Sequence, residues 1–111
     1  MSASRNIKIV CDSKEQISRI PGLMSDFGLS DCVSRKVRNL SGGMKRRVAI
    51  IRALLSSHDL LIMDEPFKGL DETTRLAVMH SVRKETPEDT ILMITHDISE
   101  AEFFNAEIIN L

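Results

Sequence analysis

The chain has 111 residues, of which 42% are hydrophobic and 28% charged, and its net charge is −1. This length suits one domain with its own core, and the low content of Gly and Pro excludes a disordered chain. The near-zero charge excludes binding to nucleic acid through bulk electrostatics, and no apolar run reaches the roughly 18 residues of a membrane-spanning helix.

The first predicted element is a helix that begins after Ser13. Ser13 and Gln16 have the spacing of a capping box, and Gly28 is a natural left-handed stop after apolar residues at helical spacing. Pro21 should kink or divide this helix, because proline lacks an amide hydrogen and crowds the preceding turn. We expect residues 31–39 to form a polar connector.

A second helix is predicted from Ser41 to about Leu55, with Ser41 as its N-cap. The basic run at 45–47 is interpreted as the solvated side of this helix. The apolar face should contain Met44, Val48, Ile51 and Leu55.

Strands then alternate with helices. Residues 60–63 and 90–95 are apolar on both faces, which is typical of buried parallel strands. Alternation of strands and helices predicts an α/β fold with a parallel sheet. The remaining expected elements are a helix at 72–84 capped by Asp71, a helix capped by Asp97, and a last strand at 107–111.

Two acids directly follow the strand at 60–63. Ligands collect at the carboxyl ends of parallel strands, and successive residues of an extended chain point opposite ways. Asp64 can therefore hold a hydrated Mg²⁺ while Glu65 acts as a general base on water. The alternative is that Asp64-Glu65-Pro66 merely ends a strand and begins a turn.

Three further segments are candidates for ligand contacts. Ser41-Gly42-Gly43 opens a helix, where free N–H groups suit a phosphate oxygen, although ordinary capping explains the same residues. His96 follows the second strand and can donate a hydrogen bond to a phosphate or water. Gly69-Leu70-Asp71 is a turn that ends in an N-cap. His58 and His80 are expected to be surface or helix-face residues.

In this order, the motifs resemble those of ATP-binding cassette (ABC) ATPases. The resemblance is strong from residue 40 to residue 111 and loose from 6 to 39. It implies part of a P-loop NTPase (RecA-like) parallel sheet with flanking helices, with 1–40 as the remnant of a helical subdomain and 41–111 as the signature helix and the C-terminal part of the ATPase core. The matching segments are 40–44 (signature), 60–66 (Walker B and catalytic glutamate), 69–71 (D-loop) and 95–97 (H-loop).

The resemblance also implies a role for each residue. Asp64 would hold Mg²⁺ through water, Glu65 would polarise the attacking water, and His96 would contact the γ-phosphate. Asp71 would communicate across a dimer, and the glycines at 42–43, with Ser41, would close over ATP bound to the opposite subunit.

The implied protein is the C-terminal half of an ATPase subunit that couples ATP binding and hydrolysis to transmembrane transport. Its cofactors would be ATP and Mg²⁺, shared with a second ABC ATPase subunit, and its other partners would be transmembrane permease subunits. It would lie in the cytoplasm, at the inner face of the cell membrane through those partners. Residues 63–67 and 95–101 look importer-like.

One departure from the family is large. The sequence contains no G-x-x-x-x-G-K-[ST] phosphate loop. We therefore expect the chain alone neither to bind nor to hydrolyse Mg-ATP. Two alternatives stay open: a non-catalytic module that donates its signature motif to a full cassette, and a soluble ABC ATPase of DNA repair or chromosome maintenance. Met44, where the latter often have an acid, counts against the second.

Overall fold

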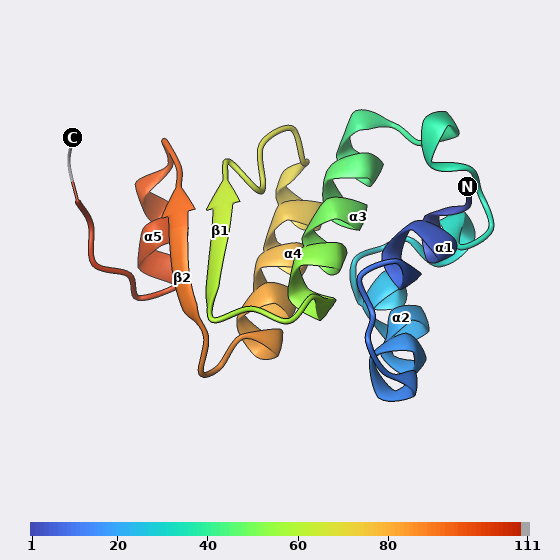
Figure 1. Ribbon diagram of the computed structural model, residues 1–111. Coiled ribbons are helices and arrows are strands. Elements are labelled where there is room, and N and C mark those ends of the chain that lie inside the picture. Colours follow the sequence, from blue (N-terminus) through green and yellow to red (C-terminus); the bar gives the residue numbers. More distant parts are fainter. Residues whose placement is uncertain (110–111) are drawn as a thin grey trace.

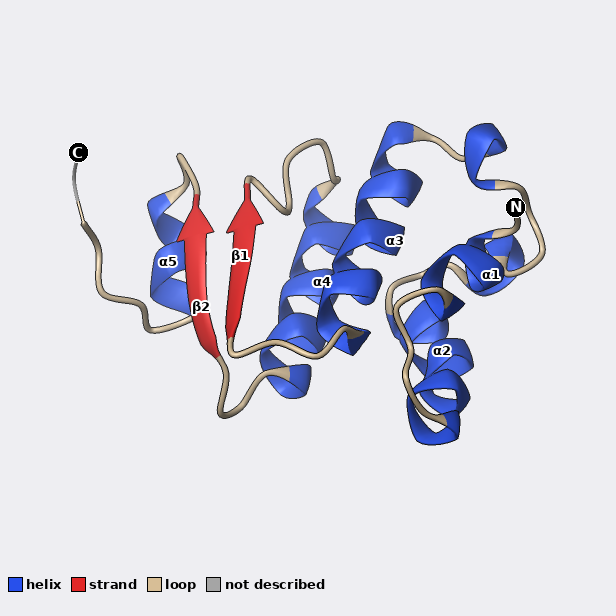
Figure 2. Ribbon diagram, in the orientation of Figure 1, coloured by secondary structure: helices blue, strands red, loops and turns tan. Residues whose placement is uncertain are grey.

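The computed structural model describes residues 1–109, which form a small parallel sheet with helices against one face and further helices beside it (Figures 1 and 2). The predicted α/β class with a parallel sheet is confirmed. In chain order the elements are α1 (Ala3–Lys8), α2 (Lys14–Asp26), the 3₁₀ turns η1 (Ser30–Cys32) and η2 (Val37–Asn39), α3 (Gly42–Leu55), β1 (Leu60–Asp64), α4 (Glu72–Glu85), β2 (Thr90–Ile94) and α5 (Ile98–Phe103).

The helices begin at the predicted caps. Each capping side chain accepts a hydrogen bond from a backbone N–H in the first turn, which satisfies a donor that the helix itself cannot. At α2 the capping box is complete, because the Gln16 side chain also accepts from the Ser13 N–H. The four predicted caps are Ser13, Ser41, Asp71 and Asp97.

The N-terminal region differs from expectation in three places. Pro21 does not divide its helix, because α2 runs through it from Lys14 to Asp26. It stops as predicted at Gly28, whose φ is +73°, and the Leu29 N–H donates to the Met24 carbonyl at 2.7 Å. The expected polar connector contains two 3₁₀ turns and a buried Cys32, and α1 has no counterpart in the prediction.

Helices α1, α2 and α3 pack together beside the N-terminus (Figure 1). Ile7, Met24 and Ile51, one from each helix, have no exposed surface. The predicted apolar face of α3 is confirmed at Val48, Ile51 and Leu55, with Met44 half-buried.

The interpretation of 45–47 as a solvated face is wrong for two of its three residues. Arg47 is half-buried, and its guanidinium donates to the Phe27 carbonyl at 2.9 Å and to the Gly43 carbonyl at 3.2 Å. Arg46 is also half-buried and donates to the Glu65 carbonyl. The Arg47 side chain thus reaches the C-terminal end of α2, and that of Arg46 reaches the turn after β1; periodicity does not reveal these contacts.

The sheet pairs β1 with β2 in parallel, from Leu60 opposite Thr90 to Asp64 opposite Ile94. The expectation that both faces are buried is wrong. Leu61 and Met63 point into the core, whereas Ile62 is 60% exposed and Ile94 is 51% exposed. In the part of the chain that the structure describes, helices cover one face of the sheet only, and the other face keeps its apolar side chains in solvent.

α4 and α5 cover the buried face and contact each other. The guanidinium of Arg83 lies 4.3 Å from the centre of the Phe103 ring, and the rings of Phe67 and Phe104 stack at 6.0 Å. The predicted last strand is not present at residues 107–109, and residues 110–111 lie outside the described part. Within residues 1–109, no helix has both the length and the apolar character needed to span a bilayer.

Candidate functional site

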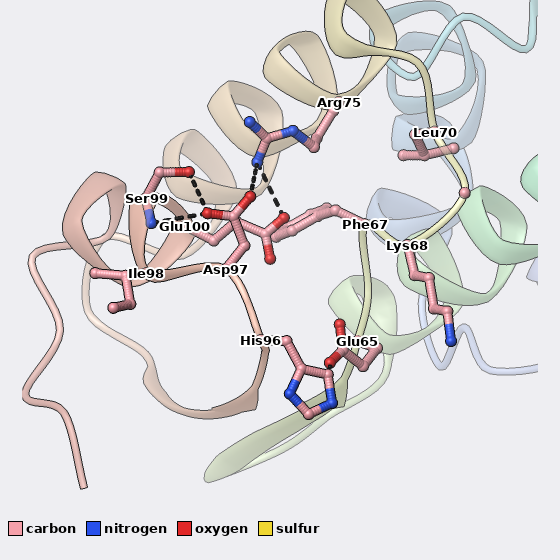
Figure 3. A pocket seen from close by; sticks show the side chains of 11 residues that line it. Glu65, Phe67, Lys68, Leu70, Arg75, His96, Asp97, Ile98, Ser99 and Glu100 are labelled. Carbon is pink, nitrogen blue, oxygen red and sulfur yellow. Dashed lines mark hydrogen bonds and ion pairs between the residues drawn. The ribbon is translucent and has the colours of Figure 1, made fainter. Parts of the chain in front are cut away.

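The carboxyl ends of β1 and β2 bring Glu65 and His96 together. Parallel strands end at the same edge of a sheet. Glu65 directly follows β1, and His96 lies two residues after the end of β2. Glu65 Oε1 lies 3.3 Å from His96 Nε2, and both side chains line an open depression of about 630 Å³ (Figure 3). Two residues that are far apart in sequence thus share one site.

The backbone of Glu65 is held in an unusual conformation. Its φ is +47°, a left-handed value that costs a non-glycine residue about 1–3 kcal/mol and that is found often at functional sites. The Glu65 N–H donates to the Ile94 carbonyl at 2.8 Å, and Arg46 donates to the Glu65 carbonyl. Bonds on both sides of the residue therefore compensate for the strain and aim the side chain at the depression.

The carboxylate of Glu65 has a free acceptor. Its Oε1 is shielded from solvent and accepts no hydrogen bond from residues 1–109, because the His96 nitrogen lies close but not in hydrogen-bonding geometry. The His96 side chain is 94% exposed. A buried carboxylate oxygen without a donor suits a bound water or ligand hydroxyl, since such atoms normally have a partner.

Asp64 points away from Glu65. It is the last residue of β1, on the exposed face of the sheet, and it lines a second depression together with Gly42, Lys45 and Arg46. The two adjacent acids therefore line different depressions.

A magnesium ion at Asp64 would have few protein ligands. Residues 1–109 gather no cluster of three or more His, Cys, Asp or Glu side chains that could hold a metal ion. Mg²⁺ is, however, often bound by one or two carboxylates with waters and substrate phosphates. A lone exposed carboxylate fits a magnesium ion that is shared with a nucleotide, and Asp64 would be its protein ligand.

The polar groups of the other predicted residues serve as helix caps. Ser41 Oγ accepts from the Met44 N–H at 3.2 Å. Asp71 accepts from the Thr74 N–H at 2.9 Å and from the Thr74 hydroxyl at 3.0 Å, and these bonds lower the pKa of Asp71. Ser41 and Asp71 line neither depression. Their ligand roles remain predictions.

The glycines at the start of α3 lie in different surroundings. Gly42 is exposed and has open space where a Cβ would stand, whereas a Cβ on Gly43 would lie 3.4 Å from Leu70. The start of α3 therefore packs against the turn that precedes α4, while Gly42 stays accessible.

Sequence reasoning missed three residues around the site: Arg46, Arg75 and Glu100. Arg75 and Glu100 line the same depression as Glu65 and are bonded to each other at 3.1 Å. Glu100 lies three residues after the Asp97 cap, a spacing that indicates only a helix start. Its contact with Arg75 of α4 is not visible in that pattern. His58 and His80 lie away from the site, as expected, although His58 is half-buried and paired with Asp89 at 2.8 Å.

Comparison with known proteins identifies the family of this chain. A model of the ABC transporter family matches residues 1–68. The thiamine import ATP-binding protein ThiQ of Histophilus somni is 40% identical over 90 residues, which are 79% of this chain and 42% of that protein. The bicarbonate transport ATP-binding protein CmpD of Synechococcus elongatus is 46% identical over 78 residues, 68% of this chain and 28% of that protein.

A solved structure has the same fold. The structure of an ATP-binding subunit of an ABC transporter superposes with a TM-score of 0.80 at 28% identity, and it covers 94% of this chain and 46% of that one. The chain spans less than half the length of these relatives. On the family match and the similarity of fold, this chain belongs to the ABC transporter family of ATP-binding proteins.

Proposed function

We propose that this chain is part of the ATPase subunit of an ABC transporter and supplies the hydrolytic residues of a nucleotide site. Glu65 orients and deprotonates the attacking water, and His96 contacts the γ-phosphate. Asp64 would hold the Mg²⁺ that accompanies the nucleotide, and the ion would offset the charge of its phosphates. ABC ATPases in general use ATP with Mg²⁺, and the relatives of this chain are named as ATP-binding proteins.

The observation that carries the proposal is the pair formed by Glu65 and His96. The shielded Oε1 of Glu65 accepts no hydrogen bond from residues 1–109, which leaves an acceptor for a water, and the His96 imidazole 3.3 Å away can donate to that water or to a phosphate oxygen. A general base must lie within hydrogen-bond reach of the proton that it abstracts. This pair provides a base and a polar guide in one open depression.

The rest of the nucleotide site would come from elsewhere. No Gly-Lys pair occurs in the 111 residues, so the backbone cradle for the β- and γ-phosphates must be supplied by another segment. We propose that Ser41, Gly42 and Gly43 face a nucleotide bound to a second cassette, and that permease subunits hold the assembly at the cytoplasmic face of the membrane.

Co-expression with a phosphate-loop segment tests this function. The N-terminal part of a relative, which contains that loop, is expressed with this chain, and ATP hydrolysis is measured with and without Mg²⁺. The isolated chain should bind no labelled ATP at micromolar concentration. The complex should hydrolyse it, and Glu65→Gln should reduce turnover about 10²–10⁴-fold, because a general base contributes that much.

Glu88→Gln is the matched control, since Glu88 is an exposed loop residue outside both depressions. Turnover of this variant should equal that of the parent. Full activity of Glu65→Gln, or hydrolysis by the isolated chain, would refute the proposed role.

A second candidate function is supported by the exposure of Ser41 and Gly42 at the start of α3. In this case the chain donates only its signature motif, and hydrolysis occurs in a complete cassette. The two functions are separated by mixing the chain with a full-length cassette. Ser41→Arg would abolish stimulated turnover under both, whereas Glu65→Gln would leave it unchanged only if the chain is a non-catalytic module.

A further inference from the structure

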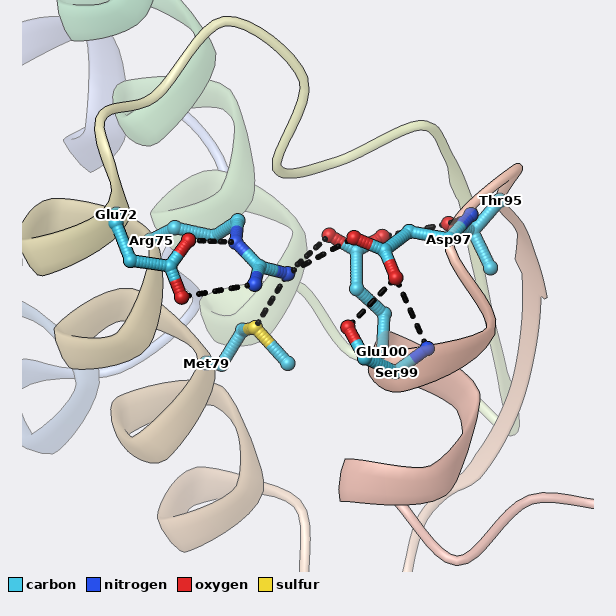
Figure 4. A network of polar contacts seen from close by, with 7 residues as sticks. All are labelled: Glu72, Arg75, Met79, Thr95, Asp97, Ser99 and Glu100. Atoms are coloured by element: carbon cyan, nitrogen blue, oxygen red, sulfur yellow. Dashed lines mark hydrogen bonds and ion pairs between the residues drawn. The ribbon is translucent and has the colours of Figure 1, made fainter.

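A buried carboxylate four residues after His96 has no part in the proposed chemistry. The side chain of Glu100, on α5, is only 6% exposed. Both of its oxygens are bonded: Oε1 accepts from the Thr95 hydroxyl at 2.5 Å, and Oε2 accepts from Arg75 at 3.1 Å (Figure 4). A glutamate is rarely buried unless it is paired, so the burial of Glu100 depends on these two partners.

The side chain of Arg75 is also held by its own helix. Glu72, one turn earlier on α4, accepts two bonds from its guanidinium, each of 3.1 Å. The outer nitrogen Nη1 is then directed across to Glu100 and, at 3.5 Å, to Asp97. Figure 4 shows the guanidinium between the two helices. Residues of α4 thus hold the Arg75 guanidinium in the position where it pairs with Glu100 of α5.

The bonds of Glu100 continue into the turn that contains His96. The Thr95 hydroxyl, which donates to Glu100, accepts from the Asp97 N–H at 3.0 Å. Asp97 in turn accepts from the Ser99 N–H at 2.9 Å. The residues on both sides of His96 are therefore tied down, while its exposed ring has Glu65 as its close polar neighbour. The position of the ring depends on this turn.

We propose that Glu100 is a positioning residue. By holding Thr95, it keeps the Thr95–Asp97 turn in the conformation that places His96 beside Glu65, and Arg75 provides the charge that keeps Glu100 in place. The importance of this for hydrolysis rests on the function proposed above. The placement of the ring itself does not, and it can be measured without nucleotide.

A purely structural role is the competing explanation. A buried ion pair often adds little net stability, because desolvation offsets the attraction, but breaking one by removing a partner is costly. Loss of stability in a Glu100 variant would therefore not identify a positioning role. The test needs a signal from His96 itself, and a variant that removes one hydroxyl without disturbing the charges.

The experiment is NMR on the full 111-residue chain with labelled histidine. Contacts between the His96 ring and the Glu65 side chain give cross-peaks, and His58 and His80 serve as internal references. Thr95→Val keeps the shape of the side chain but removes the hydroxyl, and Thr95→Ser restores the hydroxyl. Glu100→Gln removes the charge from the pair, and Glu102→Gln is the control, because Glu102 is exposed on the same helix.

We expect the His96–Glu65 cross-peaks to be lost in Thr95→Val and Glu100→Gln and to persist in Thr95→Ser and Glu102→Gln, with the His80 signals unchanged. Cross-peaks that persist in Thr95→Val and Glu100→Gln would overturn the proposal. It would also be overturned if these two variants unfolded the chain while the other two did not, since the network would then serve stability alone.

Hydrolysis by the co-expressed complex adds a second measurement. Thr95→Val and Glu100→Gln should lower kcat roughly ten- to a hundredfold, the effect of one charge-assisted hydrogen bond, with the KM for ATP nearly unchanged. Thr95→Ser should restore the rate. A change confined to KM would contradict positioning of His96. If Glu65→Gln had no effect on turnover, the proposed function would fail, whereas the NMR result would still decide the role of Glu100.

Discussion

The helical region and the sheet of this protein are packed in different ways. Within α1, α2 and α3, side chains such as Ile7 and Ile51 are wholly buried. In the sheet, every second residue of β1 is exposed, including Ile62. The strands have the more apolar sequences of the two regions, so composition did not decide which side chains are buried. Burial instead follows the number of neighbouring elements. Each of these helices packs against others, whereas helices lie on only one face of the strands in the described residues.

The site lies on the less covered region. Glu65 and His96 follow the ends of the two strands. Arg46 of α3 donates to the Glu65 carbonyl after β1, and Thr95 after β2 donates to Glu100, which is paired with Arg75 of α4. A small sheet with a bare face can therefore still hold a precise site, because its carboxyl edge is attached to the well-packed helices.

The largest expected effect compares the same substitution in the two regions. Ile51→Ala, in α3, should lower the free energy of unfolding by about 2–5 kcal/mol, since it leaves a cavity at a fully buried position. Ile62→Ala, in β1, should cost less than about 1 kcal/mol. Urea denaturation at pH 7 measures both. Equal losses would mean that the bare face of the sheet is covered in solution.

A smaller effect is expected where α2 meets α3. Gly28→Ala should cost about 1–2 kcal/mol, because φ is +73° and the new Cβ would lie 3.2 Å from the Arg47 guanidinium. Gly22→Ala is the matched control. Gly22 lies inside α2 with open space around its Cβ position, so alanine should stabilise the chain by about 0.5–1 kcal/mol. Two changes of the same sign would disprove the left-handed stop.

The smallest effect concerns the loops that precede the two strands. The hydrogen bond with Asp89 is the main cause that raises the pKa of His58, and the Ser56 carbonyl adds to it. A raised pKa in the folded state stabilises the chain below the unfolded pKa of about 6.5, and this stabilisation is lost as the pH rises through the folded pKa. The amount should be below about 1 kcal/mol.

Thermal unfolding at pH 6 and pH 9 measures this difference. The parent should lose stability between the two values, and Asp89→Asn should lose less, whereas Glu88→Gln should behave like the parent. An identical pH dependence in Asp89→Asn and the parent would show that the pair does not contribute.

Much of the local structure could be predicted from the sequence. The caps at Ser13, Ser41 and Asp71 and the stop at Gly28 were all correct, because each depends on bonds between residues within about one turn of each other. The order of strands and helices was also enough to predict a parallel α/β fold. The catalytic roles of Asp64, Glu65 and His96 stay predictions.

The tertiary structure decided what no local pattern contains. Burial of the strands was predicted on both faces and occurs on one, because burial requires a neighbour and the sequence of a strand does not specify it. Arg46 and Glu100 carry ordinary signals of a helix surface and a helix start. Yet Arg46 bonds across the fold to the Glu65 carbonyl, and Glu100 joins Arg75 of α4 to Thr95 in the turn before His96. The sequence alone determined which side chains cap the ends of the helices. The packing of those helices determined which side chains from different elements contact each other.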